Sequence, residues 1–209
     1  RHATPRRPRA RAFSAEGDAA RTVRHPRRRL SSSRASTPIV SSLSNVSLVE
    51  LEHRLVARGF KGSHAAPLLR AFYAGGAHAP AEAGPRRQPA GLRDWIAAEF
   101  PGVAASPARR HVAGDGTVKL LLRLSDGRTV ESVLMPDFDP ARAAGCVSSQ
   151  VGCAMGCDFC ATTRTGFERN LTAGEMTEQF IALRREAATA GRRLRTLVFM
   201  GMGEPMLNL

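Results

Sequence analysis

The stretch that decides the fold runs from residue 146 to residue 160 and reads C-V-S-S-Q-V-G-C-A-M-G-C-D-F-C. All four cysteines of the chain fall within it. Cys153, Cys157 and Cys160 have the spacing C-x3-C-x2-C, and Cys146 stands seven residues ahead of them. Thiolates are the soft ligands of zinc and of iron–sulfur clusters, so three of them on one short loop can converge on a single inorganic centre.

The spacing alone leaves two kinds of centre open. A three-cysteine iron–sulfur cluster keeps one iron free of protein ligands, where a small molecule can bind and react. A structural zinc site is closed by four ligands and would also use Cys146. Cysteines clustered in this way do not resemble a secreted disulfide framework, so the sequence favours a reducing compartment.

The residues after the cysteine stretch predict a helix and then a strand. Thr172-Ala173-Gly174-Glu175 is a capping box, and the helix it opens should end at Gly191. The apolar face of that helix is expected to hold Met176, Phe180, Leu183 and Ala187. The apolar run Thr196–Met200 is typical of a buried parallel strand. A strand before the cysteine loop, the helix and this strand would make a right-handed βαβ unit.

A glycine-rich turn follows that second strand. It reads Gly201-Met202-Gly203-Glu204-Pro205 and lies at a carboxyl end, where α/β folds place ligands. The glycines would let the backbone approach a ligand closely, and Glu204 could hold an ammonium group. Alone this would be an ordinary turn, but the cysteine loop one βαβ unit earlier makes it a specific candidate.

A β-hairpin is predicted ahead of the cysteine stretch. Residues 119–124 and 129–135 are strand-like, and Ser125-Asp126-Gly127-Arg128 between them is a strong turn signal. Glu131 lies in the second strand on the same face as Val133. The pattern favours a solvent-facing carboxylate; the sharper alternative is a carboxylate directed into a site, where it could act as a base.

The chain ahead of the hairpin divides into two parts. Residues 1–45 carry eleven arginines against two acids and show no hydrophobic period, which predicts disorder. Their composition resembles an organellar transit peptide, while a basic RNA-contacting tail and a misplaced gene start are the alternatives. Residues 46–108 are expected to form a small helical accessory unit, with helices beginning at the capping box Ser47–Glu50, near Ala65 and near Leu92. Residues 77–88 read as a linker between the second and third helices.

The formal net charge of +13 permits binding to a polyanion without demonstrating it. Outside residues 1–45 the chain holds 20 basic and 16 acidic residues, so its body is only mildly basic. No apolar run reaches the length of a membrane span, and no signal-peptide pattern is present.

Taken together, the motifs resemble the radical S-adenosylmethionine methyltransferases that methylate carbon 2 of adenosine in 23S rRNA and tRNA. The residues that carry the resemblance are C-V-S-S-Q-V-G-C at 146–153, C-x3-C-x2-C at 153–160, G-F-x-R-N-L at 166–171 and G-M-G-E-P at 201–205. The match is dense from about residue 114 to 209 and looser from 47 to 110, and residues 1–45 lie outside it.

The resemblance implies a role for each matched site residue. Cys153, Cys157 and Cys160 correspond to the ligands of a [4Fe-4S] cluster. Gly203 and Glu204 correspond to the motif that holds the methionine end of S-adenosylmethionine.

Two further residues gain catalytic roles from the resemblance. Glu131 corresponds to the family's proton acceptor. Cys146 corresponds to the cysteine that resolves the protein–RNA adduct and forms a disulfide with a methyl-carrying cysteine. In the family, one S-adenosylmethionine methylates that second cysteine, and another supplies the radical that activates the methyl group.

The expected fold class is α/β: the start of a radical-SAM partial (β/α) barrel in residues 109–209, preceded by a helical RNA-binding accessory domain and a β-hairpin. Two parallel strands do not complete such a barrel, so we expect the chain to be a fragment, inactive on its own. The methyl-carrying cysteine would lie beyond it.

The resemblance also implies partners. These are 23S rRNA and tRNA, a reducing partner such as flavodoxin or ferredoxin, no membrane, and a monomeric state. The protein would be cytoplasmic, or plastid or mitochondrial if residues 1–45 are a transit peptide. The alternatives in function are a zinc-stabilised RNA-binding module and a resistance-type relative that methylates carbon 8.

Overall fold

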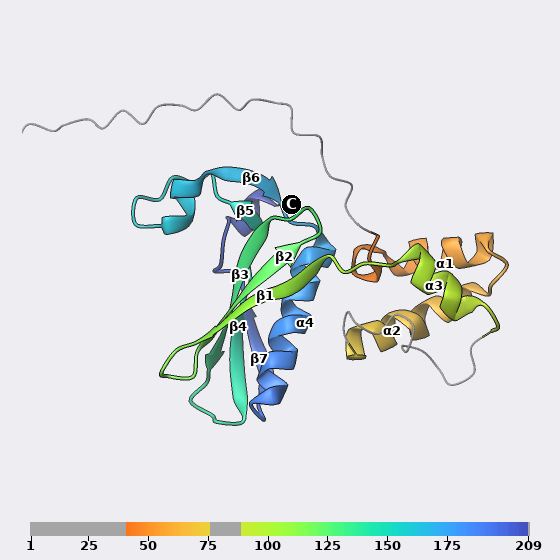
Figure 1. The fold of residues 1–209 in the computed structure, drawn as a ribbon, viewed down its shortest axis with the longest axis horizontal. Coiled ribbons are helices and arrows are strands. Elements are labelled where there is room, and N and C mark those ends of the chain that lie inside the picture. The colour runs from red at the N-terminus through yellow and green to blue at the C-terminus, as the bar shows by residue number, and fades with distance from the viewer. Residues whose placement is uncertain (1–40, 76–88, 209) are drawn as a thin grey trace, which may run out of the picture. The chain divides into compact units, whose positions relative to one another are not determined.

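A computed structural model describes residues 41–75 and 89–208 (Figure 1). Residues 1–40 of the predicted disordered tail and the linker at 77–88 lie outside the described residues. Residues 41–45, which we expected within that tail, are ordered. Leu43–Asn45 forms a 3-10 helix, η1, whose Leu43 is buried among the helices that follow. Ordered structure therefore starts earlier than the sequence predicted.

Three α-helices follow η1, as the sequence predicted. They are α1 (Leu48–Ala57), α2 (Ala65–Gly75), which is preceded by the 3-10 helix η2 (Gly62–His64), and α3 (Leu92–Glu99). Ser47 caps α1 by accepting a hydrogen bond from the amide of Glu50, and Gly59 follows the helix with φ of 81°. Leu51 and Leu55 are buried in the helical core, whereas Leu48, predicted on the same face, is exposed in the first turn.

A five-stranded sheet in the described part of the chain has the order β1-β2-β3-β4-β7. Its strands are β1 (Ala105–Val112), β2 (Val118–Leu124), β3 (Thr129–Pro136), β4 (Arg142–Cys146) and β7 (Arg193–Val198). Neighbouring strands are antiparallel except for β4 and β7, which are parallel. Two short strands, β5 (Gln150–Gly152) and β6 (Phe167–Asn170), form a separate antiparallel pair.

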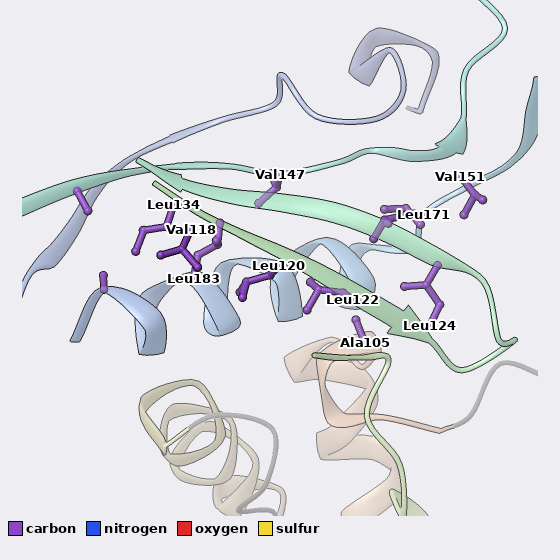
Figure 2. Packing of buried hydrophobic residues seen from close by; sticks show 13 residues of the cluster. Ala105, Val118, Leu120, Leu122, Leu124, Leu134, Val147, Val151, Leu171 and Leu183 are labelled. Atoms are coloured by element: carbon purple, nitrogen blue, oxygen red, sulfur yellow. The ribbon is translucent and has the colours of Figure 1, made fainter. Parts of the chain in front are cut away.

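Helix α4 (Ala173–Thr189) connects the two parallel strands and packs on one face of the sheet. The predicted capping box is complete, because the Thr172 and Glu175 side chains each bond the other's backbone amide. Figure 2 shows Leu120, Leu122 and Leu183 in the apolar layer between the strands and this helix. Val130 and Leu134 alternate with half-exposed residues along β3, so one face of the sheet is buried against α4.

The opposite face of the sheet, called the open face below, carries half-exposed and exposed side chains. Strand β2 presents Lys119, Leu121 and Arg123 there, and β3 presents Glu131 and Val133. The strand register places one row of residues directly across this face: His111, Lys119, Val133, Cys146 and Val198. Cys146 and Glu131 therefore belong to the same face of the sheet, away from α4.

Two strands differ from the sequence predictions. Strand β1 was not predicted, and it crosses the boundary that we placed at residue 108 between the helical unit and the core. The second parallel strand, expected to be buried at Thr196–Met200, instead spans Arg193–Val198 and is largely exposed. Its exposure has a simple cause, since β7 is the edge strand of the described sheet.

None of the helices in the described ranges is both long enough and apolar enough to span a membrane.

Candidate active site

The two predicted motifs lie at the same end of the sheet, where strands β4 and β7 finish. Parallel strands β4 and β7 are paired from Arg142↔Arg193 to Cys146↔Val198, so both end at the same edge. The cysteine loop starts directly after Cys146, and the glycine loop at 201–205 starts three residues after Val198. The topology therefore places both motifs at carboxyl ends of neighbouring strands, as the sequence predicted.

Ser148 links the glycine loop to strand β3. Its side chain is fully buried, and its hydroxyl donates to the Glu131 carbonyl oxygen at 2.6 Å. The same hydroxyl oxygen accepts from the Met202 amide at 2.9 Å. The amides of Ser149 and Gln150 donate to the Met202 carbonyl oxygen at 2.8 and 3.2 Å. Residue 202 is thus held at both of its backbone polar groups.

Two buried glutamines complete this support. The Oε1 atom of Gln150 accepts from the Glu204 amide at 3.0 Å, and its Nε2 atom donates to Asn170 at 2.9 Å. The Oε1 atom of Gln179, on α4, accepts from the Ser148 amide at 2.8 Å, and its Nε2 atom donates to the Ser148 carbonyl oxygen at 3.0 Å. Both side chains are almost fully buried with their polar atoms paired, which makes the support rigid.

The glycines at 201 and 203 approach the chain's own backbone. A Cβ on Gly203 would lie 2.5 Å from Gln150 Cβ, and the residue has φ of 99°. A Cβ on Gly201 would lie 2.7 Å from Ser148 Oγ and 2.8 Å from the Val147 carbonyl oxygen. The sequence argument assigned the close approach to a ligand. The structure instead gives an internal reason for both glycines, because side chains here would push the loop off residues 147–150.

Glu204 sits at the end of this loop with one oxygen occupied. Its Oε1 atom accepts from the Met206 amide at 3.0 Å and so caps the 3-10 helix η4 (Pro205–Leu207). The other oxygen has no hydrogen bond to any residue within 41–75 or 89–208. A half-buried carboxylate with one free oxygen remains suited to the predicted contact with an ammonium group.

The three cluster-type cysteines lie on one loop, but their thiols are not gathered. Cys153 is buried, whereas Cys157 and Cys160 are half-buried. The Cys160 amide donates to the Cys157 carbonyl oxygen at 3.1 Å, and Thr163 Oγ1 donates to both carbonyls, so the last two cysteines share a tight turn. Among the described residues, no group of three or more Cys, His, Asp or Glu has an arrangement that could hold a metal.

The surroundings of Cys160 nevertheless suit a thiolate ligand. Hydrogen bonds from the amide and hydroxyl of Thr162, and from the amide of Thr163, hold the pKa of the Cys160 thiol below its ordinary value. Clusters bound by thiolates usually have hydrogen-bond donors around their sulfur atoms. The donor set of three thiols on one loop therefore fits a cluster of the predicted type.

Cys146 and Glu131 have contrasting environments. Burial raises the pKa of the Cys146 thiol, and a hydrogen bond from the Met200 amide opposes that shift in part. The Glu131 carboxylate is about half exposed and pairs with Lys119 Nζ at 3.0 Å. All four cysteines are free thiols. Glu131 is thus solvent-facing, as the pattern favoured, and also on the face that carries Cys146.

A buried ionic network anchors the far side of the cysteine loop. Arg169, on β6, donates to both carboxylate oxygens of Glu175 at 2.7 and 2.8 Å and to Asp126 at 2.7 Å. These bonds, with Glu175 contributing most, raise the pKa of Arg169 well above its ordinary value. The network joins the β2–β3 turn, β6 and the first turn of α4. Just before β6, the Gly166 carbonyl oxygen accepts a hydrogen bond from the Cys153 amide.

Sequence reasoning missed the residues that position the two loops. Ser148, Gln150 and Arg169 appeared only as letters within the family motifs, and Gln179 did not appear at all. No local sequence signal marks them, since their neighbours in the chain include polar residues such as Ser149, Glu168 and Glu178.

The comparisons with known proteins agree with this architecture. The chain is 62% identical over 168 residues to a probable dual-specificity RNA methyltransferase RlmN 1 from Opitutus terrae, covering 80% of this chain and 47% of the relative. It is 42% identical over 177 residues to a probable RlmN from Rhodopirellula baltica, covering 85% and 46%. The chain thus spans about half the length of the curated relatives it matches. No family model matches the chain.

A solved structure agrees at the level of the fold. A crystal structure of a radical SAM methyltransferase from Sphaerobacter thermophilus superposes with a TM-score of 0.70 at 43% identity, covering 80% of this chain and 48% of that one. The described fold therefore corresponds to about half of a radical SAM methyltransferase. Within that class its relatives by sequence are the dual-specificity RNA methyltransferases named RlmN, which confirms the resemblance found in the motifs.

Proposed function

We propose that the full-length protein methylates carbon 2 of adenosine in 23S rRNA and tRNA, using a [4Fe-4S] cluster and S-adenosylmethionine. The observation that carries the proposal is the hydrogen-bonded contact between the cysteine stretch and the glycine loop through Ser148 and Gln150. Relatives of the chain at 62% and 42% identity are named dual-specificity RNA methyltransferases.

Each predicted site residue has a place in this proposal. Cys153, Cys157 and Cys160 would hold the cluster, while Gly203 and Glu204 would receive the methionine end of the cofactor. When bound, the two groups supply a radical and a transferable methyl group.

The two residues on the open face would act on the RNA side of the reaction. Glu131 is half-exposed on this face, so a bound base can reach its carboxylate, which would hold or accept a proton there. Cys146 is buried, with its thiol pKa raised, so it stays protonated at neutral pH and is kept from adventitious reaction until the site is occupied. The partner cysteine of Cys146 in the proposed disulfide would come from outside this chain.

The cellular setting belongs to the same proposal. We place the protein in the cytoplasm, acting as a monomer with a flavodoxin- or ferredoxin-type reductant.

The direct test is methyl transfer by the anaerobically reconstituted full-length protein. Transcripts of tRNA and of a 23S rRNA fragment would be incubated with S-adenosylmethionine and reductant, digested to nucleosides and analysed by mass spectrometry. We expect 2-methyladenosine as the product. Formation of 8-methyladenosine instead would identify a carbon-8 enzyme, and absence of any methylated nucleoside from a protein that holds iron and sulfide would contradict the proposal.

A Cys146→Ser variant distinguishes the proposed radical enzyme from a protein with a structural zinc site of four cysteines. The proposed enzyme should retain its iron and sulfide and lose turnover. A four-cysteine zinc site should instead lose its metal and unfold, and a colourless wild-type protein with one zinc per chain would contradict the enzyme reading outright.

A further inference from the structure

The open face of the sheet carries a group of basic residues on its first two strands. Arg109 and His111 lie on β1, and Lys119 and Arg123 lie on β2. All four side chains are exposed. This group is called the basic face below.

The strand register makes these residues close neighbours. His111 lies directly opposite Lys119, and Arg109 lies opposite Leu121, between Lys119 and Arg123 on the facing strand. Side chains directly opposite each other have Cβ atoms about 4.5–5.5 Å apart, and diagonal neighbours about 7–8 Å. Arg109 is therefore a diagonal neighbour of both Lys119 and Arg123, and like charges on neighbouring positions of a sheet repel.

Most of this charge is left unpaired. Lys119 bonds Glu131 at 3.0 Å, but both side chains are about half exposed, so the pair is weak. Arg109, His111 and Arg123 form no ion pair with any residue in the described ranges. The contrast is Arg110, which points to the other face and pairs with Glu186 of α4 at 2.7 Å.

The basic face leads directly to the candidate active site. Lys119 and Cys146 belong to the same row across the sheet, with Val133 between them. Neighbouring strands lie about 4.7–4.9 Å apart, so this row puts the two residues about 10 Å from each other. A ligand bound along the cations would extend over Glu131 toward Cys146.

We propose that the basic face binds the phosphodiester backbone of the RNA and so positions the target base at Cys146. The inference rests on the proposed function and adds the surface that holds the substrate. Unpaired arginines match phosphate geometry through bidentate hydrogen bonds, and phosphate contacts set the position of a nucleic acid while base contacts select it.

The test compares two charge-matched double variants of the full-length protein. Arg109→Gln with Arg123→Gln removes the two unpaired arginines of the basic face. Arg193→Gln with Arg195→Gln removes two exposed arginines from β7 instead. Binding of a fluorescein-labelled tRNA transcript would be followed by fluorescence anisotropy at several KCl concentrations.

The basic-face variant should bind at least about tenfold more weakly at 0.1 M salt and lower the slope of log K against log salt by about 1.4–1.8 units. The β7 variant should keep the wild-type slope. Arg109→Lys with Arg123→Lys retains both charges, so it should keep most of the slope and show that the loss is not a folding defect.

An equal loss in both glutamine variants, or wild-type binding by the basic-face variant, would overturn the inference. Neither result depends on methyl transfer, because RNA binding is measured directly. Failure of the proposed function would appear separately, as wild-type protein that produces no methylated nucleoside.

Discussion

At the scale of single residues, Ser148 has the most specific role. Its hydroxyl bonds both the Glu131 carbonyl oxygen and the Met202 amide. This one buried hydroxyl therefore fixes the position of the glycine loop relative to β3, the strand that carries Glu131. No property of a lone serine in a sequence signals such a role, because the role exists only when strands β3 and β7 flank β4.

Replacing Ser148 with alanine should weaken the binding of S-adenosylmethionine. The change leaves the Met202 amide and the Glu131 carbonyl without a partner, which costs about 1–3 kcal/mol and loosens the loop. We expect about tenfold or greater loss of affinity by titration calorimetry, with iron content unchanged.

Ser149→Ala is the matched control. The Ser149 hydroxyl is also buried but has no hydrogen-bond partner among the described residues, so its removal breaks no bond. If both variants lose affinity equally, the role given to Ser148 is wrong.

Cys146 should be slow to alkylate. Its raised pKa lowers the thiolate fraction at any given pH, so the midpoint of iodoacetamide labelling should lie at higher pH in the folded protein than in urea. Peptide mass spectrometry across a pH series measures this directly. A folded-state midpoint below that of the unfolded chain would contradict the burial argument.

At the scale of elements, the cysteine loop is held at both ends. Residues 147–150 tie its start to the glycine loop, and Arg169 on β6 ties its end to the β2–β3 turn and to α4. The loop between these anchors carries the cluster-type cysteines. Its geometry therefore depends on elements that are far apart in sequence.

Arg169→Gln should be strongly destabilising. The variant leaves the fully buried Glu175 without its cation and leaves Asp126 with Arg128 alone, and breaking such a buried pair costs about 3–5 kcal/mol. Urea unfolding measures the loss. Arg142→Gln, which removes only an exposed pair with Asp139, should cost less than about 1 kcal/mol.

The advantage of wild type over Arg169→Gln should also depend on pH. Burial raises the pKa of Asp126, but hydrogen bonds from the Arg128 amide and from Arg169 outweigh it, so the net pKa is below its ordinary value. A lowered carboxyl pKa contributes stability that is present above about pH 4 and is lost as the pH falls further. A stability difference that stays constant down to pH 2 would contradict the ionic account.

The elements that could be predicted from the sequence are those with a strong local signal. The Ser47 cap, the capping box at Thr172 and the turn at 125–128 each set their element by contacts within four residues, although the box predicted at Ser47 is only half formed because the Glu50 side chain bonds Arg54. Strand β1 could not be predicted in this way. It is polar, contains Pro107 and has a bulge before Arg109, so only its pairing with β2 at the sheet edge makes it a strand.

The residues of the candidate site also differ in how far the sequence could predict them. The cysteines, Glu131 and the glycine loop could be proposed from spacing and from family motifs. The buried glutamines and Ser148 could not, because their partners lie far away in the sequence and the pairing exists only through tertiary contacts. The structure adds a reason for Gly201 and Gly203 that the sequence did not reveal, since a side chain at either position would collide with residues 147–150.

At the scale of the whole described unit, Glu178 joins the helical segment to the sheet. Its buried carboxylate accepts from the hydroxyls of Ser42 and Ser44 at 2.8 and 2.5 Å and from the Ala105 amide at 2.8 Å. The Glu178 carboxylate of α4 thus holds residues 42–44 and the first residue of β1 together.

Glu178→Ala should lower the free energy of unfolding by about 2–4 kcal/mol, because it leaves the Ala105 amide and at least one of the two serine hydroxyls, which otherwise bond each other at 2.8 Å, without an acceptor. Ser42→Ala removes only one of those donors and should cost about 1 kcal/mol or less. Urea titrations of both variants test the ranking, and equal losses would contradict the shared-acceptor account.

The most direct test of the central claim, that the cysteine and glycine loops form one cofactor site, is electron paramagnetic resonance of the reduced, reconstituted full-length protein. Adding S-adenosylmethionine should shift the cluster signal in wild type. It should leave the signal unchanged in Gly203→Ala, which retains its iron but pushes the loop off Gln150. A wild-type protein without such a signal, or an identical shift in the variant, would contradict the account.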